Sequence, residues 1–157
     1  MQYSEFIGKV QTMAGLPSED EAVKITRVTL ETLATRLAGN EPQHLADQLP
    51  AEIGRFLTES EGARRTESFS LDEFYQRVAE RTGAEEPAAR HHCRAVMSVL
   101  RNALSPGEIE DMKSQLPPEF DALLNPPEPG SDSPKARRER PSGSKRGSVR
   151  RPKDEEE

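Results

Sequence analysis

Apolar residues near the start of the chain recur at the spacing of one helical face. Phe6, Val10 and Met13 are separated by four and three positions, which places them on the same side of an α-helix. Ser4 is a residue type that caps helix starts, and Gly15 readily adopts the left-handed conformation of a helix end. We therefore predict a first helix between Ser4 and Gly15.

A second, longer helix is predicted from Ser18 to about Ala38. Ser18 and Glu21 form a capping box, in which the serine hydroxyl accepts a hydrogen bond from the backbone N–H three residues on. The apolar residues of this segment cover more than one narrow stripe, as expected of a helix that packs on several sides. They are Ala22, Val23, Ile25, Val28, Leu30, Leu33 and Leu37.

Two short helices are predicted to complete this half of the chain. The first covers residues 42–48 and turns Leu45 inward together with Leu49, which follows it. Pro50 starts the other, because a proline in the first turn lacks an N–H that would have no partner there. The apolar face of this helix consists of Ile53, Phe56 and Leu57.

The same order of elements is predicted again from residue 70. A capping box at Ser70 and Glu73 starts a helix that ends at Gly83, and Pro87 starts a long helix that runs to Leu104. Two shorter helices follow, and their starts are marked by Ser105, Glu108, Pro117 and Pro118.

Two stretches of the chain have nearly the same sequence. Residues 47–53 are DQLPAEI and residues 114–120 are SQLPPEF, sixty-seven positions later. The same offset pairs Arg27 with Arg94, and an offset of sixty-eight pairs Phe6 with Phe74. Such self-similarity indicates an internal duplication. We predict one repeat over 3–57, a linker over 58–69 and a second repeat over 70–124.

Each repeat is close to the size at which an isolated domain buries too little surface to be stable. The two repeats are therefore expected to share one core in a single helical domain over residues 1–124. We predict an all-α fold, a helical bundle of about eight helices built from two pseudo-symmetric repeats. No segment shows the alternation that is typical of a β-strand.

The openings and closings of the two repeats resemble those of a known family. Each opening has the pattern EF…V…G, and the closings are QLPAEI and QLPPEF. On these motifs, the chain from about Tyr3 to Leu124 resembles the bacterial proteins catalogued as the domain of unknown function 2267. The resemblance implies an all-helical fold, and it implies no activity, cofactor or catalytic residue.

The net charge of −6 hides a difference between the body and the C-terminal part of the chain. Residues 1–124 carry thirteen Lys and Arg and twenty-one Asp and Glu, a net of −8, whereas residues 125–157 carry nine and seven, a net of +2. An acidic body is a poor surface for nucleic acid. Residues 125–157 are rich in Pro, Ser and Arg and nearly devoid of apolar side chains, so we expect a disordered basic tail.

The basic tail offers one alternative function. Residues 135–153 hold nine cations and one acid, Glu139, and such a segment binds phosphates by releasing counterions, with little sequence preference. No aromatic residue is present there to stack on bases, and a tail that only solubilises the protein is the other alternative. The predicted nucleic-acid contacts are Lys135, Arg137, Arg138, Arg140, Lys145, Arg146, Arg150, Arg151 and Lys153.

The compartment follows from what the sequence lacks. No run of apolar residues is long enough to span a membrane, and the start MQYSEF does not have the basic and then apolar plan of a signal peptide. The single cysteine, Cys93, has no partner for an internal disulfide. We expect a soluble cytoplasmic protein.

Two groups of residues are of types that bind metals. His91, His92 and Cys93 are adjacent, but ligands on one helix need a spacing of three or four residues, so we interpret them as core or boundary residues. Glu41 and His44 have the Glu-x-x-His spacing of di-iron helical bundles, and Glu108 and Asp111 occupy the matching positions of the second repeat. Because all four lie at short, polar helix starts, where Glu is expected as a cap partner, we predict no metal site and no cofactor.

The sequence contains no motif of a known catalytic site. A Gly-rich phosphate loop, a Gly-x-Ser-x-Gly elbow and a Cys-x-x-Cys pair are all missing. We predict a non-enzymatic protein, most simply a module that binds an unknown protein partner. Four twinned charges are candidates for a partner cleft between the repeats, if they do not pair with one another: Arg27, Arg94, Glu52 and Glu119.

Overall fold

The computed structural model describes residues 1–59 and 66–124 of the 157-residue chain. These residues form eight α-helices and one short 3-10 turn, with no strand among them, so the predicted all-α fold is confirmed. The helices are α1 (Tyr3–Ala14), α2 (Glu19–Arg36), α3 (Glu41–Ala46), α4 (Ala51–Thr58), α5 (Leu71–Thr82), α6 (Glu86–Ala103), α7 (Pro106–Ser114) and α8 (Asp121–Leu124), and the 3-10 turn η2 (Pro118–Phe120) precedes α8. The predicted tail and its nine cations lie outside the described residues.

Most of the predicted helix ends are confirmed. The side chain of Ser18, which caps α2, accepts a hydrogen bond from the backbone of Glu21 at 3.2 Å, and Gly15 and Gly83 have φ values of 71° and 76°. The capping boxes at Ser70 and Ser105 form in the same way. The prediction for the first helix start was wrong, because α1 already begins at Tyr3 and its N-cap is Gln2.

Two further boundaries differ from the prediction. Leu37 is extended, with φ −97° and ψ 145°, so α2 ends at Arg36 and not near Ala38. Pro50 is the N-cap of α4 and not a residue of its first turn. Both differences are of one or two residues and leave the order of the helices as expected.

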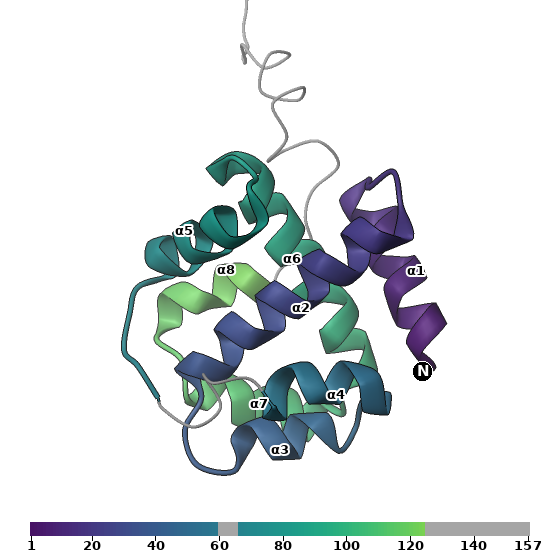
Figure 1. The fold of residues 1–157 in the computed structure, drawn as a ribbon. Coiled ribbons are helices and arrows are strands. Elements are labelled where there is room, and N and C mark those ends of the chain that lie inside the picture. Colours follow the sequence, from purple (N-terminus) through teal and green to yellow (C-terminus); the bar gives the residue numbers. More distant parts are fainter. Residues whose placement is uncertain (60–65, 125–157) are drawn as a thin grey trace, which may run out of the picture.

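The first helix of each half packs against the long helices of both halves. α1 packs against α2 of its own half and against α6 of the other, and α5 packs against α6 and against α2. The long helices α2 and α6 contact each other. Helices α1 and α5 lie on opposite sides of this pair (Figure 1). Each long helix is thus covered by helices of both halves.

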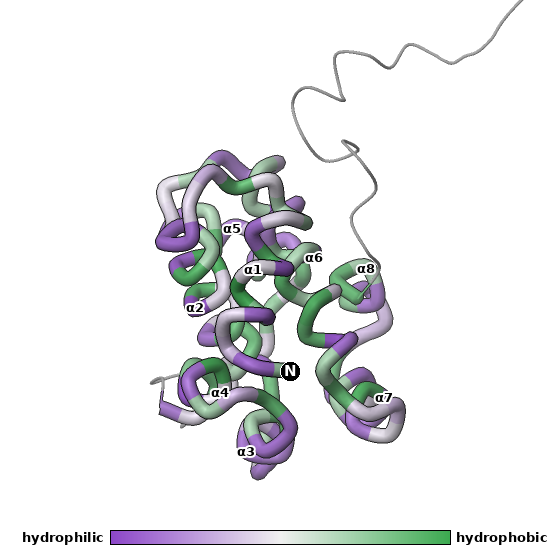
Figure 2. Tube along the Cα trace, turned by 90° about the vertical axis from the view of Figure 1, so that its right-hand side faces the viewer, coloured by the Kyte–Doolittle hydropathy of each residue, from purple (hydrophilic) through white to green (hydrophobic). Residues whose placement is uncertain are grey.

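Buried side chains of both halves form one hydrophobic cluster. Phe6, Leu33 and Ile53 come from the first half, Phe74 and Phe120 come from the second, and all five are at most 1% exposed. Hydrophobic and hydrophilic stretches alternate along the helices, as expected of amphipathic helices around a shared core (Figure 2). Burial of each such side chain contributes roughly 1.5–3 kcal/mol.

The repeated QLP stretches make equivalent contacts across the two halves. The side-chain oxygen of Gln48 accepts a hydrogen bond from the backbone N–H of Ser105 at 2.8 Å, and that of Gln115 accepts one from Ala38 at 2.8 Å. Ser105 and Ala38 belong to the segments that lead into α7 and α3. These bonds place α3 beside α7, with which it is in contact.

The chain that leads into α5 is attached to the end of α2. The hydroxyl of Thr66 donates to the carbonyl of Leu37 at 2.9 Å, and Phe69 is 8% exposed. The guanidinium of Arg36, itself buried, lies 5.5 Å from the ring centre of Phe69 and 5.1 Å from that of Phe120. At least residues 66–69 of the predicted linker are therefore part of the packed structure.

Candidate functional site

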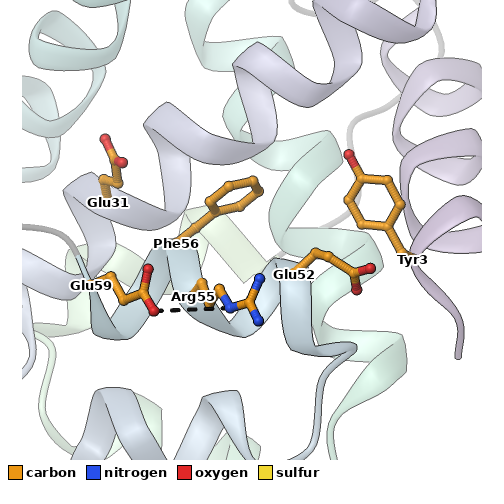
Figure 3. A pocket seen from close by; sticks show the side chains of 6 residues that line it. All are labelled: Tyr3, Glu31, Glu52, Arg55, Phe56 and Glu59. Atoms are coloured by element: carbon orange, nitrogen blue, oxygen red, sulfur yellow. Dashed lines mark ion pairs between the residues drawn. The ribbon is translucent and has the colours of Figure 1, made fainter.

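A groove opens on the surface between α1, α2 and α4. Its volume is about 550 Å³, and side chains of all three helices line it (Figure 3). The lining residues are Tyr3, Glu31, Glu52, Arg55, Phe56 and Glu59. The half-buried ring of Phe56 packs against the core and gives the groove an apolar part. We call this surface the acidic groove.

Negative charge dominates the acidic groove. Three carboxylates face one guanidinium, that of Arg55, whose Nε lies 3.9 Å from Oε2 of Glu59. Glu31 also pairs with Arg81 of α5. The pKa of the Tyr3 hydroxyl is raised, first by burial and then by the charges of Glu19, Glu52 and Asp20. The carboxylate of Glu52 extends toward Tyr3 (Figure 3) and is exposed.

The corresponding residues of the second half make contacts within the fold. Glu119, the counterpart of Glu52, accepts a hydrogen bond from the backbone N–H of Leu71 at the start of α5, with 3.3 Å between the two atoms. Leu123, the counterpart of Phe56, is completely buried. The two halves therefore differ most clearly where the acidic groove lies.

The structure separates the four twinned charges that were candidates for a partner cleft. Of these, only Glu52 lines the acidic groove. Glu119 caps α5, Arg27 is exposed on α2, and Arg94 is half-buried on α6. The other groove residues were not predicted, because the groove arises from the packing of α1 against α4 and no local pattern announces it.

A second group of polar side chains meets where α3 contacts α7. Glu41 and His44 of α3 and Glu108 of α7 each offer a ligand atom, and these three atoms lie within 4.8 Å of one another. Nδ1 of His44 is 3.8 Å from Oε1 of Glu41. The side chain of Glu41 is only 5% exposed, whereas that of His44 is 56% exposed. We call these residues the Glu41 cluster; they are the ones in the described chain that could hold a metal.

The pKa of the Glu41 carboxyl is raised to about 8. Burial is the largest cause, followed by hydrogen bonding to Glu108 and by the negative charges of Glu108 and Asp111. No N–H or O–H donor from the described residues reaches Oε2 of Glu41 or Oε2 of Glu108. A shared proton or a bound cation would satisfy both oxygen atoms.

The adjacent residues His91, His92 and Cys93 do not converge on a metal-like site. Cys93 is completely buried, and the hydroxyl of Thr29 donates to its sulfur at 3.9 Å. His91 and His92 are half-buried, with their ring centres 6.1 Å apart. Burial and the charge of His91 lower the pKa of His92 to about 4. None of these residues belongs to the group of possible metal ligands found among the described residues.

Within the described residues, the fold defines an all-helical protein whose two halves share their long helices. The match to a family is direct: residues 3–123 match the family described as "Uncharacterized conserved protein (DUF2267)". The chain belongs to this family. No protein of curated function matches it. Within the described residues, no helix is both long and apolar enough to cross a membrane.

Proposed function

We propose that this protein is a non-enzymatic interaction module whose acidic groove binds a basic, amphipathic segment of a partner protein. The observation that carries the proposal is the contrast between the two halves. Glu119 and Leu123 are used within the fold, whereas Glu52 and Phe56, at the same places in the first half, face the groove. The side chains of the first half are thus available for contacts outside the fold.

The chemistry of the groove indicates what would bind there. An apolar side chain of the partner would pack on Phe56 and Tyr3, because contact between apolar surfaces removes both from water. Lysine or arginine side chains beside it would face Glu52 and Glu59. Opposite charges at the rim of an interface mainly raise the association rate and select the partner. Their contribution to the affinity is smaller.

The lining of the groove favours binding of a partner over nucleophilic catalysis. Its lining consists of carboxylates, one arginine and two aromatic residues, without histidine, cysteine or serine. Of the carboxylates, Glu52 and Glu59 are exposed, and a catalytic acid needs an apolar setting to hold its proton near neutral pH. These features support binding as the proposed role.

A defined peptide tests the proposal. The probe is a helical peptide with leucine on one face and lysine on the other, added to the isotope-labelled full chain in an NMR titration. Chemical shifts are expected to change at Tyr3, Phe56 and their neighbours. The variant Glu52→Lys should bind the peptide about tenfold more weakly, which corresponds to roughly 1.4 kcal/mol.

The matched control is Glu80→Lys, which makes the same charge change at an exposed position of α5 outside the groove. This variant should bind the peptide almost as well as the wild type. Equal weakening by both variants would show attraction to the net charge alone and would overturn the proposal. So would shift changes that are spread over the whole surface.

The sequence favours a second candidate function, which is binding of nucleic acid by the tail. It rests on the nine cations of residues 135–153, which lie outside the described residues. Binding of duplex DNA by the full chain should weaken steeply with salt, and a chain that ends at Asn125 should not bind. If both chains bind alike, the tail has no such role.

A further inference from the structure

We propose that Glu41, His44 and Glu108 bind a divalent transition-metal ion that joins α3 of the first half to α7 of the second. The proposal is independent of the acidic groove, which these residues do not line. It rests on the positions of three ligand atoms and on a buried carboxylate without a donor.

The ligands converge from two helices that are far apart in sequence. The three ligand atoms lie within 4.8 Å of one another, although Glu41 and Glu108 are sixty-seven residues apart. In a tetrahedral site with bonds of about 2.0–2.2 Å, neighbouring ligand atoms are separated by roughly 3.3 Å. The distance of 3.8 Å between His44 Nδ1 and Glu41 Oε1 is close to that value. The exposed ring of His44 is free to make the remaining adjustment.

Burial makes the cluster unlike an ordinary group of surface acids. The side chain of Glu41 is 95% shielded from solvent, and its Oε2 atom has no donor from the described residues. Oε2 of Glu108 is in the same situation. A buried carboxylate is normally satisfied by hydrogen bonds or by a cation, and here a second carboxylate faces it. A bound dication would neutralise both.

Glu108 is positioned without using its carboxylate. Its backbone N–H donates a hydrogen bond to the hydroxyl oxygen of Ser105 at the start of α7. The side-chain carboxylate therefore remains available to face α3. Asp111 follows one turn later, is exposed, and its charge acts on Glu41. Asp111 or a water molecule would complete a four-coordinate site.

The ligand set indicates the class of metal. Carboxylates suit magnesium, calcium and manganese, whereas imidazole suits zinc, iron and other transition metals. Two carboxylates with one imidazole therefore fit zinc, ferrous iron or manganese better than magnesium. Among the first-row dications, zinc is bound more tightly than manganese by the same ligands.

The competing explanation is a carboxyl pair that shares one proton. Glu41 and Glu108 would then be joined by a hydrogen bond, in accord with the raised pKa of Glu41, and His44 would have no part in it. The two explanations differ in the role of His44. A shared proton needs no imidazole, whereas a metal loses one of three protein ligands when the imidazole is removed.

The test uses the full chain, freed of metal with a chelator that is then removed. Titration calorimetry with zinc chloride, manganese chloride and magnesium chloride is expected to show one zinc ion per chain, weaker manganese binding and no magnesium binding. Glu108→Gln and His44→Gln should each weaken zinc binding at least tenfold. Glu110→Gln changes an exposed acid of the same helix and should leave zinc binding unchanged.

Glu41→Gln separates loss of the site from loss of the fold. A glutamine at this position can donate a hydrogen bond to Glu108, so the metal-free variant should unfold at the same temperature as the metal-free wild type or higher. It should no longer be stabilised by zinc. Absence of zinc binding in the wild type, or zinc binding that survives both Glu108→Gln and His44→Gln, would overturn the proposal in favour of the shared proton.

Discussion

The backbone of Gly54 in α4 lies directly against Ala46, the last residue of α3. A Cβ atom at position 54 would be 3.0 Å from the Cβ of Ala46 and 3.1 Å from its carbonyl oxygen. Such distances are shorter than nine in ten of the contacts that real Cβ atoms make, so Ala46 would have to move by a few tenths of an ångström. The glycine therefore allows α3 and α4 to pack together, and this contact holds α3 where it meets α7.

Replacement of Gly54 by alanine is expected to destabilise the protein by about 1–3 kcal/mol, because the added methyl group forces α3 and α4 apart. Gly8→Ala is the matched change inside α1, where a Cβ would meet nothing within 4 Å. It should stabilise by roughly 0.5–1 kcal/mol, since alanine is the better helix former. Urea unfolding measures both. Effects of the same sign would contradict the role assigned to the contact.

The glutamines of the two QLP stretches are expected to stabilise the protein by similar amounts. Gln115→Ala removes one hydrogen bond between the halves and Gln48→Ala removes two, of which the bond from Gln48 Nε2 to Ser105 Oγ is exposed and 3.3 Å long; we expect each variant to cost about 0.5–1 kcal/mol for partly solvated groups. Gln43→Ala removes only a bond to Asp47 within the same half and serves as the control. Denaturant midpoints measure the differences. A loss confined to one of the two glutamines would show that the contacts are not equivalent.

Glu119 and Glu52 are expected to contribute differently to the stability of the protein, although they occupy matching positions. Glu119→Ala removes the acceptor for the N–H of Leu71 and should cost about 0.5–2 kcal/mol, as for other lost helix caps. Glu52→Ala changes an exposed groove residue and should stay within about 0.5 kcal/mol of the wild type. Thermal unfolding of the two variants measures the difference. Equal losses of stability would contradict the contrast between the halves on which the binding proposal rests.

Cys93 is expected to be inert toward thiol reagents in the folded protein. Burial raises the pKa of its thiol to about 12, and the hydrogen bond from Thr29 only partly opposes this effect. Because the thiolate is the reactive form, its fraction at neutral pH is about a thousandfold lower than for a thiol with the ordinary pKa of 9.0. Reaction with a chromogenic disulfide should follow unfolding and be fast in guanidinium. Rapid reaction of the native protein would contradict the burial.

His92 is expected to contribute a loss of stability as the pH falls. Its pKa is lowered to about 4 in the folded state against 6.5 ordinarily, first by burial and then by repulsion from His91. The unfolded chain therefore takes up the proton first, so the stabilisation is complete above pH 6.5 and is lost as the pH falls toward 4. The slope is at most about 1.4 kcal/mol per pH unit.

His92→Gln should remove this contribution, so that the variant loses less stability in acid than the wild type does. Unfolding in urea at several values between about pH 7 and pH 4.5 gives the slope for the variant and for the wild type. The metal-free protein should be used, so that the Glu41 cluster contributes equally to both. The same slope in both proteins would mean that other groups govern the acid sensitivity.

Local signals in the sequence were sufficient for the helices. Gly15, Gly83 and the serines of the three capping boxes mark helix ends by chemistry that depends only on near neighbours. The first helix start was missed because it has no side-chain cap, so the nearest serine, Ser4, was a misleading signal. A residue that starts a helix without a cap leaves no trace in the local pattern.

The two candidate sites depend on how the halves pack, which no local pattern contains. The spacing of Glu41 and His44 was visible, but only the crossing of α3 over α7 brings Glu108 to them. A usable signal did exist. Residues at the same position of the two halves lie close together where the two equivalent helices are in contact. Acids at matching positions could therefore have been predicted to be neighbours. The acidic groove had no such signal, since Phe56 follows the same periodicity as a core residue.

The packing of α1 and α5 on both long helices has a consequence for how far each half depends on the other. A chain that consists of one half alone would lack the long helix of the other half, against which its first helix packs. The apolar face of that first helix would then be covered only by pairing with an identical molecule. A single polypeptide keeps the two halves together, and their side chains are able to differ. Glu52 and Glu119 illustrate such a difference: both are exposed, but Glu119 accepts a hydrogen bond from the backbone of Leu71, whereas Glu52 lines the acidic groove.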